Sequence, residues 1–279
     1  MPYDKITSLT NSRIKHVVQL RSRKQRMKDG LMIVEGAREI ARALEAGIVF
    51  KELYICRELL EISDNDQISA TSSTNLSDIV IKKAALKNVA IYETAQAVFS
   101  KISYGDRSEG VLAVCAPKPV IFKDFSSKKH PLFVVVECVE KPGNLGAILR
   151  TCDGAGIDGV IICDGKTDIY NPNVIRASLG MIFSIKTVVS SNKEALEFLK
   201  SRNIKICATL PLAKTVYTKA QLTDALAVVV GSEQSGLTNF WVEHADLKVK
   251  IPMRGFADSL NVSVSTAILL YETIRQRSN

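Results

Sequence analysis

The chain has 279 residues, of which 46% are hydrophobic and 24% are charged, a composition that is ordinary for a globular protein. No apolar run approaches the roughly 20 residues that span a bilayer, and the N-terminal stretch lacks a signal-peptide pattern, so we expect a cytoplasmic protein with no membrane partner. The 37 Lys and Arg residues outnumber the 29 Asp and Glu residues, and this net charge of +8 favours a polyanionic partner.

The cysteines and histidines show no spacing that is typical of a metal site. The 6 cysteines are scattered without a CxxC pair, and the 3 histidines lie far apart. Several cysteines stand within apolar runs, so we expect reduced thiols in the core and no bound metal.

The first predicted helix, which Asn11 can cap and Gly30 can end, carries a strongly basic surface. No acidic residue stands between residues 13 and 28. Charge alone supports phosphate contact and a solvated helix face about equally. The candidate phosphate-contacting residues are Arg13, Lys15, Arg21, Arg23, Lys24 and Arg26.

The remainder of the first half has the β-α-β rhythm of a small α/β domain, which we place at residues 1–117. We expect strands at 31–34, 51–55, 79–81 and 111–116, helices at 37–46 and 94–102, and a polar loop at 63–78. The stretch at 117–131 holds three prolines and a Ser-Ser-Lys-Lys run, and it predicts an extended linker at residues 118–130.

Predominantly apolar runs with several β-branched residues dominate the second half, at residues 132–136, 159–163, 204–208 and 225–230. Such runs are typical of parallel strands that are buried on both faces, and helical segments such as 193–200 stand between them. We therefore predict a second α/β domain at residues 131–279, with a mostly parallel sheet covered by helices on both faces.

Three polar or glycine-rich segments follow the predicted strands, where open α/β sheets tend to bind ligands. They are PGNLGAILRT (142–151), VVGSEQSGL (229–237) and IPMRGFADSLNVSVSTA (251–267). None contains GxGxxG or GxxxxGK[ST], so a dinucleotide site and a P-loop are poorly supported. Each segment also has a simple structural interpretation as a turn, and the local pattern alone favours Ser259 and Asn261 as helix caps.

Taken together and in this order, the three segments resemble the motifs of the SpoU, or TrmH-like, branch of the SPOUT RNA methyltransferases. Residues 11–47 are similar to the ribosomal-protein-like RNA-binding domain that often precedes this catalytic domain. The resemblance implies a trefoil-knot catalytic domain, S-adenosylmethionine as the cofactor, a ribose 2′-hydroxyl as the methyl acceptor, and a homodimer.

The resemblance also implies roles for residues of this chain. The implied catalytic residues are Asn144, Arg150, Glu233, Ser259 and Asn261. The implied cofactor-binding residues are Thr209, Leu210, Gly231, Ile251, Met253 and Leu260, which act mainly through their backbone. Arg176 is a further candidate for phosphate contact. Because a guanidinium is a poor base, we expect Arg150 to bind phosphate and stabilise the developing alkoxide rather than to accept a proton.

The basic N-terminal domain favours ribosomal RNA as the substrate, because its surface can grip a structured RNA through the RNA backbone. Three alternatives stay open at this point. They are a tRNA 2′-O-methyltransferase, an enzyme that methylates a base, and a non-catalytic RNA-binding factor for ribosome assembly.

Overall fold

The computed structural model describes residues 3–60, 76–105, 109–165 and 167–278. It divides into two compact units, of which the first comprises residues 1–118 together with 169–184, and the second residues 119–168 together with 185–279. The chain thus leaves the second unit after Asp168 and returns to it at Ile185. Most of the polar loop predicted at 63–78 lies outside the described residues.

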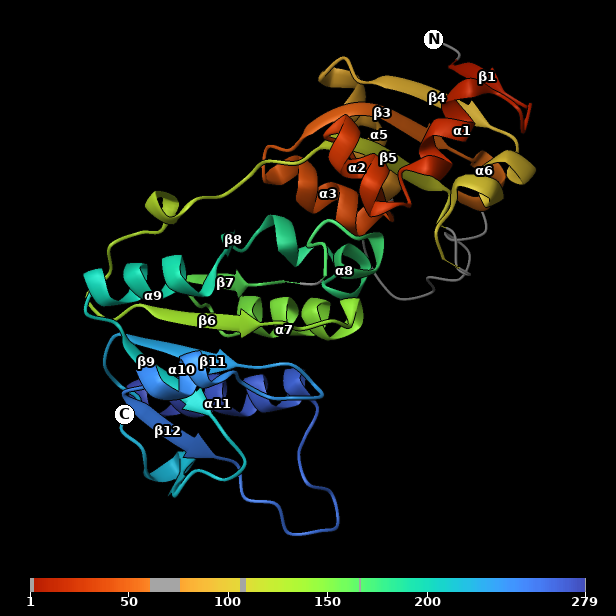
Figure 1. The fold of residues 1–279 in the computed structure, drawn as a ribbon. Helices are drawn as coiled ribbons and strands as arrows, with labels where there is room; N and C mark the ends of the chain where they lie inside the picture. The colour runs from red at the N-terminus through yellow and green to blue at the C-terminus, as the bar shows by residue number, and fades with distance from the viewer. Residues whose placement is uncertain (1–2, 61–75, 106–108, 166, 279) are drawn as a thin grey trace. The chain divides into compact units, whose positions relative to one another are not determined.

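A mixed five-stranded sheet forms the centre of the first unit (Figure 1). Its strand order is β1 (Asp4–Ile6), β4 (Ala90–Thr94), β3 (Val49–Ile55), β5 (Val111–Ala116) and β2 (Met32–Glu35). The pairs β1/β4 and β3/β4 are parallel, whereas β5 is antiparallel to both of its neighbours. The strands predicted at 31–34, 51–55 and 111–116 are therefore confirmed to within a few residues.

The first predicted helix is in fact two helices, α1 (Ser12–Gln19) and α2 (Arg23–Asp29). Asn11 caps α1, as predicted, by accepting a hydrogen bond from the Arg13 N–H. The chain turns between the helices, where Arg26 Nη1 donates to the carbonyl oxygens of Leu20 and Arg21 at 2.8 and 2.7 Å. The single-helix prediction was wrong because the basic residues of both helices form one uninterrupted run in the sequence.

The strand predicted at 79–81 is also wrong, since these residues lie within helix α5 (Leu76–Leu86). Its buried residues are Ser77, Val80 and Ala84, the spacing of one helix face, and the helix packs against α3 (Ala37–Glu45). Burial of this face overrides the strand preference of Ile79, Val80 and Ile81. The predicted helix at 94–102 is confirmed as α6 (Gln96–Ile102).

The segment at 169–184 belongs to the first unit although its flanking strands belong to the second. It contains α8 (Pro172–Ala177) and the short 3₁₀ helix η2 (Met181–Phe183), which pack against β2 and α3 respectively. Arg42 on α3 donates a hydrogen bond to the Leu179 carbonyl oxygen. These contacts tie a piece of the second half of the sequence to the first unit.

The sheet of the second unit has seven strands, all of them parallel to their neighbours. In spatial order the strands are β10 (Thr215–Val216), β12 (Leu247–Lys250), β9 (Lys205–Thr209), β11 (Leu226–Val230), β6 (Leu132–Glu137), β7 (Gly159–Cys163) and β8 (Thr187–Ser190). The four strands predicted from apolar runs form its centre and are confirmed. The predicted α/β class with a mostly parallel sheet is confirmed as well.

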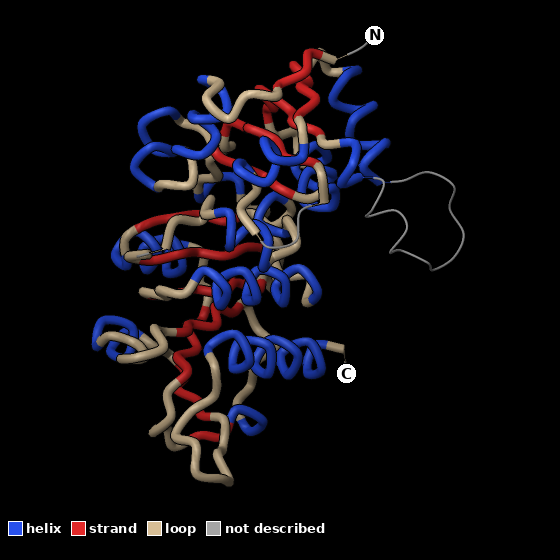
Figure 2. Tube along the Cα trace, turned by 90° about the vertical axis from the view of Figure 1, so that its right-hand side faces the viewer, coloured by secondary structure: helices blue, strands red, loops and turns tan. Residues whose placement is uncertain are grey.

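Helices cover both faces of this sheet (Figures 1 and 2). On one face, α9 (Asn192–Ser201) and α10 (Asn239–His244) bury their apolar residues against Phe133 and Val135 of β6. On the other, α7 (Pro142–Gly154) and α11 (Val262–Arg277) pack against each other and against the strands. Two short 3₁₀ helices, η1 (Phe122–Asp124) and η3 (Tyr217–Lys219), stand in connecting segments.

All six cysteines are free thiols, and five of them are buried. Burial raises the pKa of Cys163 and of Cys207 to about 12, so these thiols are protonated at neutral pH. Among the residues that the structure describes, no group of His, Cys, Asp and Glu side chains is arranged to hold a metal ion. Within the same residues, no helix is both long and apolar enough to cross a membrane.

Glu35, at the end of β2, is a partly buried carboxyl group of the first unit. Burial raises its pKa above the ordinary value of 4.5, although hydrogen bonds from Ser103 Oγ and the Tyr104 N–H and the charges of Arg176 and Arg21 oppose the rise. Ionisation of Glu35 is therefore less favourable in the folded chain than in the unfolded chain.

We expect Glu35→Gln to change how stability depends on pH. As pH rises, the unfolded chain releases this proton before the folded chain does. The unfolding free energy of the wild type should therefore fall relative to that of the variant between about pH 4.5 and the higher folded pKa. The fall is about 1.4 kcal/mol for each tenfold difference in proton affinity between the folded and unfolded chains. A glutamine can keep both hydrogen bonds by accepting from Tyr104 and donating to Ser103. Urea unfolding between pH 4 and 8 measures the effect, and parallel curves for the two proteins would contradict it.

Candidate functional site

The second unit contains a cavity of about 550 Å³ at the carboxyl ends of β9, β11 and β12. The segments that follow these three strands surround it, together with the start of α7. All six residues predicted to bind the cofactor line this cavity, namely Thr209, Leu210, Gly231, Ile251, Met253 and Leu260. The parallel sheet thus places the three predicted ligand segments side by side.

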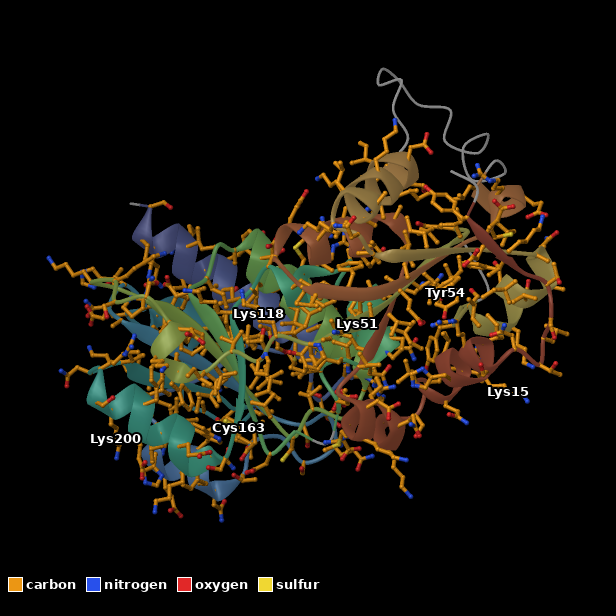
Figure 3. The ribbon with its side chains drawn as sticks, turned by 90° about the horizontal axis from the view of Figure 1, so that it is seen from above. Lys15, Lys51, Tyr54, Lys118, Cys163 and Lys200 are labelled. Carbon is orange, nitrogen blue, oxygen red and sulfur yellow. The ribbon has the colours of Figure 1, made fainter. Side chains whose placement is uncertain are left out.

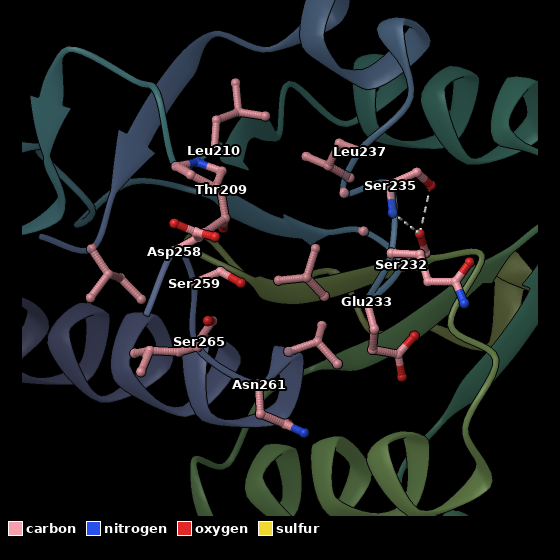
Figure 4. Close-up of a pocket in the computed structure, with 18 of the residues that line it drawn as sticks. Thr209, Leu210, Ser232, Glu233, Ser235, Leu237, Asp258, Ser259, Asn261 and Ser265 are labelled. Carbon is pink, nitrogen blue, oxygen red and sulfur yellow. Dashed lines mark hydrogen bonds between the residues drawn. The ribbon is translucent and has the colours of Figure 1, made fainter. Parts of the chain in front are cut away.

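The loop at 231–237 is closed on itself and presents its backbone to the cavity. The Ser232 N–H donates to the Gly236 carbonyl at 3.0 Å, and the Gly236 N–H donates back to Ser232 at 3.1 Å. The Ser235 N–H also donates to Ser232 Oγ at 3.1 Å (Figure 4). A Cβ atom at Gly231 would lie 2.2 Å from the Gly236 backbone, so only glycine permits this closure.

Hydrogen bonds join three of the predicted catalytic residues in one chain. Asn261 Nδ2 donates to Asn144 Oδ1 at 3.0 Å, and Asn144 Nδ2 donates to Glu233 Oε1. Asn261 Oδ1 meanwhile accepts from the Ser263 N–H at 2.9 Å, which caps α11. A backbone N–H can only donate and a carboxylate can only accept, so the two ends of the chain fix the orientation of both amides.

Asn261 is therefore a helix cap and a member of the site at the same time. The two interpretations that the sequence left open are compatible, because its two amide atoms serve one role each. Ser259 is exposed and lines the same cavity (Figure 4).

Arg150 is the one predicted catalytic residue that does not line the cavity. It lies on α7 and is exposed, six residues after Asn144, which corresponds to about 9 Å along a helix axis. Arg150 thus faces solvent beside the site rather than the interior of the cavity.

The sequence did not indicate a role for several side chains at the cavity. The Thr209 hydroxyl is buried and has no hydrogen-bond partner, although Thr209 was selected only for its backbone. Lys141, Asp258 and Ser265 also line the cavity. Ser265 could have been found, because it stands four residues after Asn261 and so shares a helix face with it.

The predicted phosphate-contacting residues of the first unit are not equivalent. Lys15, Arg23 and Lys24 are exposed, and Lys15 points away from α1 (Figure 3). Arg26 is only 5% exposed and holds the junction of α1 and α2, so its selection as a surface residue was wrong. Basic residues without acidic neighbours can therefore be buried as well as exposed.

Arg21 and Arg13 are partly engaged within the first unit. Arg21 Nη2 donates to the carbonyl oxygens of Lys101 and Ser103. Arg13 forms an ion pair with Glu52. Arg176 is exposed on α8 and belongs to the first unit.

Comparison with known proteins gives two family matches. Residues 131–271 match the SpoU rRNA Methylase family, and residues 11–113 match the MRM3-like substrate binding domain. A similar curated protein is the 23S rRNA (guanosine(2553)-2'-O)-methyltransferase RlmP of Bacillus subtilis, which is 27% identical over 267 residues that cover 95% of this chain and 97% of that protein. The 23S rRNA (guanosine-2'-O-)-methyltransferase RlmB of Pseudomonas putida is 38% identical over 176 residues, which cover 61% of this chain and 71% of that protein.

Solved structures share the fold over nearly the whole chain. A crystal structure of an RNA 2'-O ribose methyltransferase is 39% identical with a TM-score of 0.83, and the match covers 99% of this chain and 100% of that one. An AdoMet-bound rRNA methyltransferase from Sinorhizobium meliloti is 26% identical with a TM-score of 0.84 and 98% coverage of both chains. The predicted trefoil-knot methyltransferase fold is thereby confirmed, and the chain belongs to the SpoU rRNA methylase family.

Proposed function

We propose that this protein transfers a methyl group from S-adenosylmethionine to a ribose 2′-hydroxyl of ribosomal RNA. The observation that carries the proposal is the hydrogen-bonded chain of Asn261, Asn144 and Glu233 at the edge of a cavity lined by all six predicted cofactor residues. The relatives named for 2′-O-methylation of 23S rRNA support the reaction and the substrate class.

The cavity suits a cofactor that combines apolar and polar parts. Leu210, Ile251 and Leu260 supply apolar surface, and the closed loop after Gly231 supplies backbone groups. The unpartnered Thr209 hydroxyl supplies a donor, and a buried polar atom of this kind is costly unless a ligand satisfies it. When bound, S-adenosylmethionine supplies an electrophilic methyl group on its sulfonium.

The polar residues at the cavity orient the acceptor ribose. Asn144 and Asn261 are held rigidly by the chain that ends at Glu233, and this preorganisation favours one orientation of a hydroxyl group beside them. Arg150 is a poor base, because a guanidinium group holds its proton and its positive charge. Its exposed position outside the cavity suits contact with an RNA phosphate. There Arg150 stabilises the alkoxide that develops on the ribose as the phosphate or another residue takes the hydroxyl proton.

The protein acts as a homodimer in this proposal, through the catalytic domain and its helix α11. Val264, Ile268 and Tyr271 follow one another at the spacing of a single face of α11, and Val264 and Tyr271 are 46% and 53% exposed. An exposed apolar stripe on a helix is suited to contact with a second copy. We place the reaction in the cytoplasm, where the RNA substrate is.

Mapping of 2′-O-methyl groups across total RNA, from cells with and without the gene, tests the proposed function. We expect one methylated ribose of ribosomal RNA to be lost with the gene. Loss of a ribose methyl group from tRNA instead would show that tRNA is the substrate. Loss of a methyl group from a base would contradict the proposed 2′-O-methylation.

We expect Asn261→Asp and Asn261→Ser to separate the two roles of this residue. Both replacements keep a good cap for α11, so unfolding free energy should change by less than the roughly 1 kcal/mol expected for Asn261→Ala. Neither donates an amide hydrogen to Asn144, so turnover should fall on the order of 100-fold. Denaturant unfolding and single-turnover methylation measure the two effects. Full activity in either variant would show that the cap alone matters.

We expect Thr209→Val to weaken cofactor binding without destabilising the free protein. Valine has the same shape and removes an unsatisfied hydroxyl, so the unfolding free energy should stay the same or rise, whereas affinity for S-adenosylmethionine should fall roughly fivefold. Thr273→Val is the matched control, because its buried hydroxyl already donates to the Leu269 carbonyl at 2.8 Å outside the cavity. Calorimetry with an unchanged dissociation constant for Thr209→Val would contradict the role.

We expect Arg150→Lys to lose much of the methylation rate while binding of S-adenosylmethionine is kept. A lysine retains the charge but not the planar, two-pronged geometry that suits a phosphate. Activity that survives with a modest loss and an unchanged pH profile would show that no two-pronged clamp is needed.

A further inference from the structure

Glu137, the last residue of β6, is a fully buried carboxylate with three hydrogen-bond donors around it. Asn192 Nδ2 donates to its Oε1 at 2.9 Å. Thr238 donates twice, from Oγ1 to Oε1 at 2.7 Å and from its backbone N–H to Oε2 at 2.8 Å. Trp241 Nε1 in turn donates to Asn192 Oδ1 at 2.7 Å. Glu137 does not line the cavity.

Groups that can only donate set the direction of this network. An indole N–H can only donate, so it holds the Asn192 oxygen toward Trp241 and turns the Asn192 amide nitrogen toward Glu137. The Thr238 backbone N–H can likewise only donate. Glu137 therefore faces donors on both of its oxygens, and an acceptor-only carboxylate fits this position whereas an amide does not.

The network holds one end of the loop at 231–237. The loop begins at the end of β11, which is fixed in the sheet, and it ends at Thr238, which Glu137 binds through both its backbone and its side chain. The remaining loop hydrogen bonds described above are internal, between Ser232 and Gly236 and between Ser232 and Ser235. Glu233, which accepts from Asn144, stands between these two fixed ends.

We propose that Glu137 is a positioning residue that locks the 231–237 loop against β6 and so holds Glu233 toward Asn144 and the loop backbone toward the cofactor. Its role for the cofactor rests on the function proposed for the cavity. Glu137 is fully buried and does not line the cavity, so in this proposal it acts through Thr238 and the start of α10.

The test exchanges the amide and the carboxylate between two partners. In Glu137→Gln, the introduced amide nitrogen faces the Asn192 amide nitrogen. In Asn192→Asp, two carboxylates face each other. The double variant combines both changes, so the amide nitrogen at position 137 donates to the carboxylate at position 192, which also accepts from Trp241. The amide oxygen at position 137 still accepts from the Thr238 N–H, and the Thr238 hydroxyl can accept where it donated before. The double variant therefore restores every hydrogen bond with the same net charge.

We expect each single variant, measured in the full chain at a temperature where it is folded, to bind S-adenosylmethionine roughly 10-fold more weakly and to exchange the amide hydrogens of 231–238 faster. In the double variant, the affinity for S-adenosylmethionine and the amide exchange rate should both return towards the wild-type values. The sole tryptophan, Trp241, gives an independent signal, since its fluorescence reports on the Asn192 bond in the absence of cofactor. Glu243→Gln, which changes an exposed carboxylate of α10, is the control and should leave all three readouts unchanged.

Two outcomes would overturn the proposal. The first is a Glu137→Gln variant that has a lower melting temperature but the same amide exchange at 231–238 and the same affinity for S-adenosylmethionine as the wild type. The second is a double variant whose amide exchange and affinity stay as poor as those of the single variants. If the wild type does not bind S-adenosylmethionine, the proposed function fails, while amide exchange of the loop still tests the lock. Thr238→Val, which removes one bond and keeps the backbone bond, replaces Glu137→Gln if that variant does not fold.

Discussion

The parallel register of β6, β11 and β9 is the constraint on which the site depends. Val230 of β11 stands opposite Val136 of β6, and Val229 stands opposite Ala208 of β9, so the three strands end at nearly the same level. The segments that follow them must then leave the sheet at one edge. This is why polar residues that are widely separated in sequence, such as Asn144, Thr209 and Glu233, surround one cavity.

Two carboxylates then hold the loop at 231–237, one within it and one at its base. Glu233 ends a chain of two amides whose direction is set by a backbone N–H, that of Ser263. Glu137 ends a second chain whose direction is set by the indole N–H of Trp241. In both cases a donor-only group stands at one end and an acceptor-only group at the other, so an amide between them has a single satisfied orientation. Such networks specify one loop conformation more sharply than apolar packing does.

Much of the fold was predictable, because buried parallel strands leave a strong signal. Residues 132–136 and 225–230 are continuous apolar runs that each contain three valines, and they form the centre of the sheet. The same signal misled at 79–81, where β-branched residues lie in α5 and burial of one helix face decides the structure. Sequence preference is weak where tertiary packing competes with it.

The site was predictable only in part, for a related reason. Asn144, Glu233, Ser259 and Asn261 were identified by motif resemblance and do lie together. The importance of Glu137 was not visible, because a carboxylate at the end of an apolar run is typical of the solvent-exposed end of a strand. Its three donors come from residues 55 and 101 positions further along the chain. Only the folded sheet brings them together.

Charge alone does not predict which basic residues of the N-terminal stretch can contact RNA. The Arg26 guanidinium donates to carbonyl oxygens at the junction of α1 and α2. The Arg21 guanidinium donates to the carbonyl oxygens of Lys101 and Ser103. An arginine whose donors are satisfied inside the unit has fewer to offer a phosphate. The exposed Lys15 and Lys24 are then the better candidates for RNA contact, because a phosphate backbone is recognised by charge that solvent can reach. Net charge predicted a polyanionic partner, but the burial of each Lys and Arg side chain decides whether it can contact that partner.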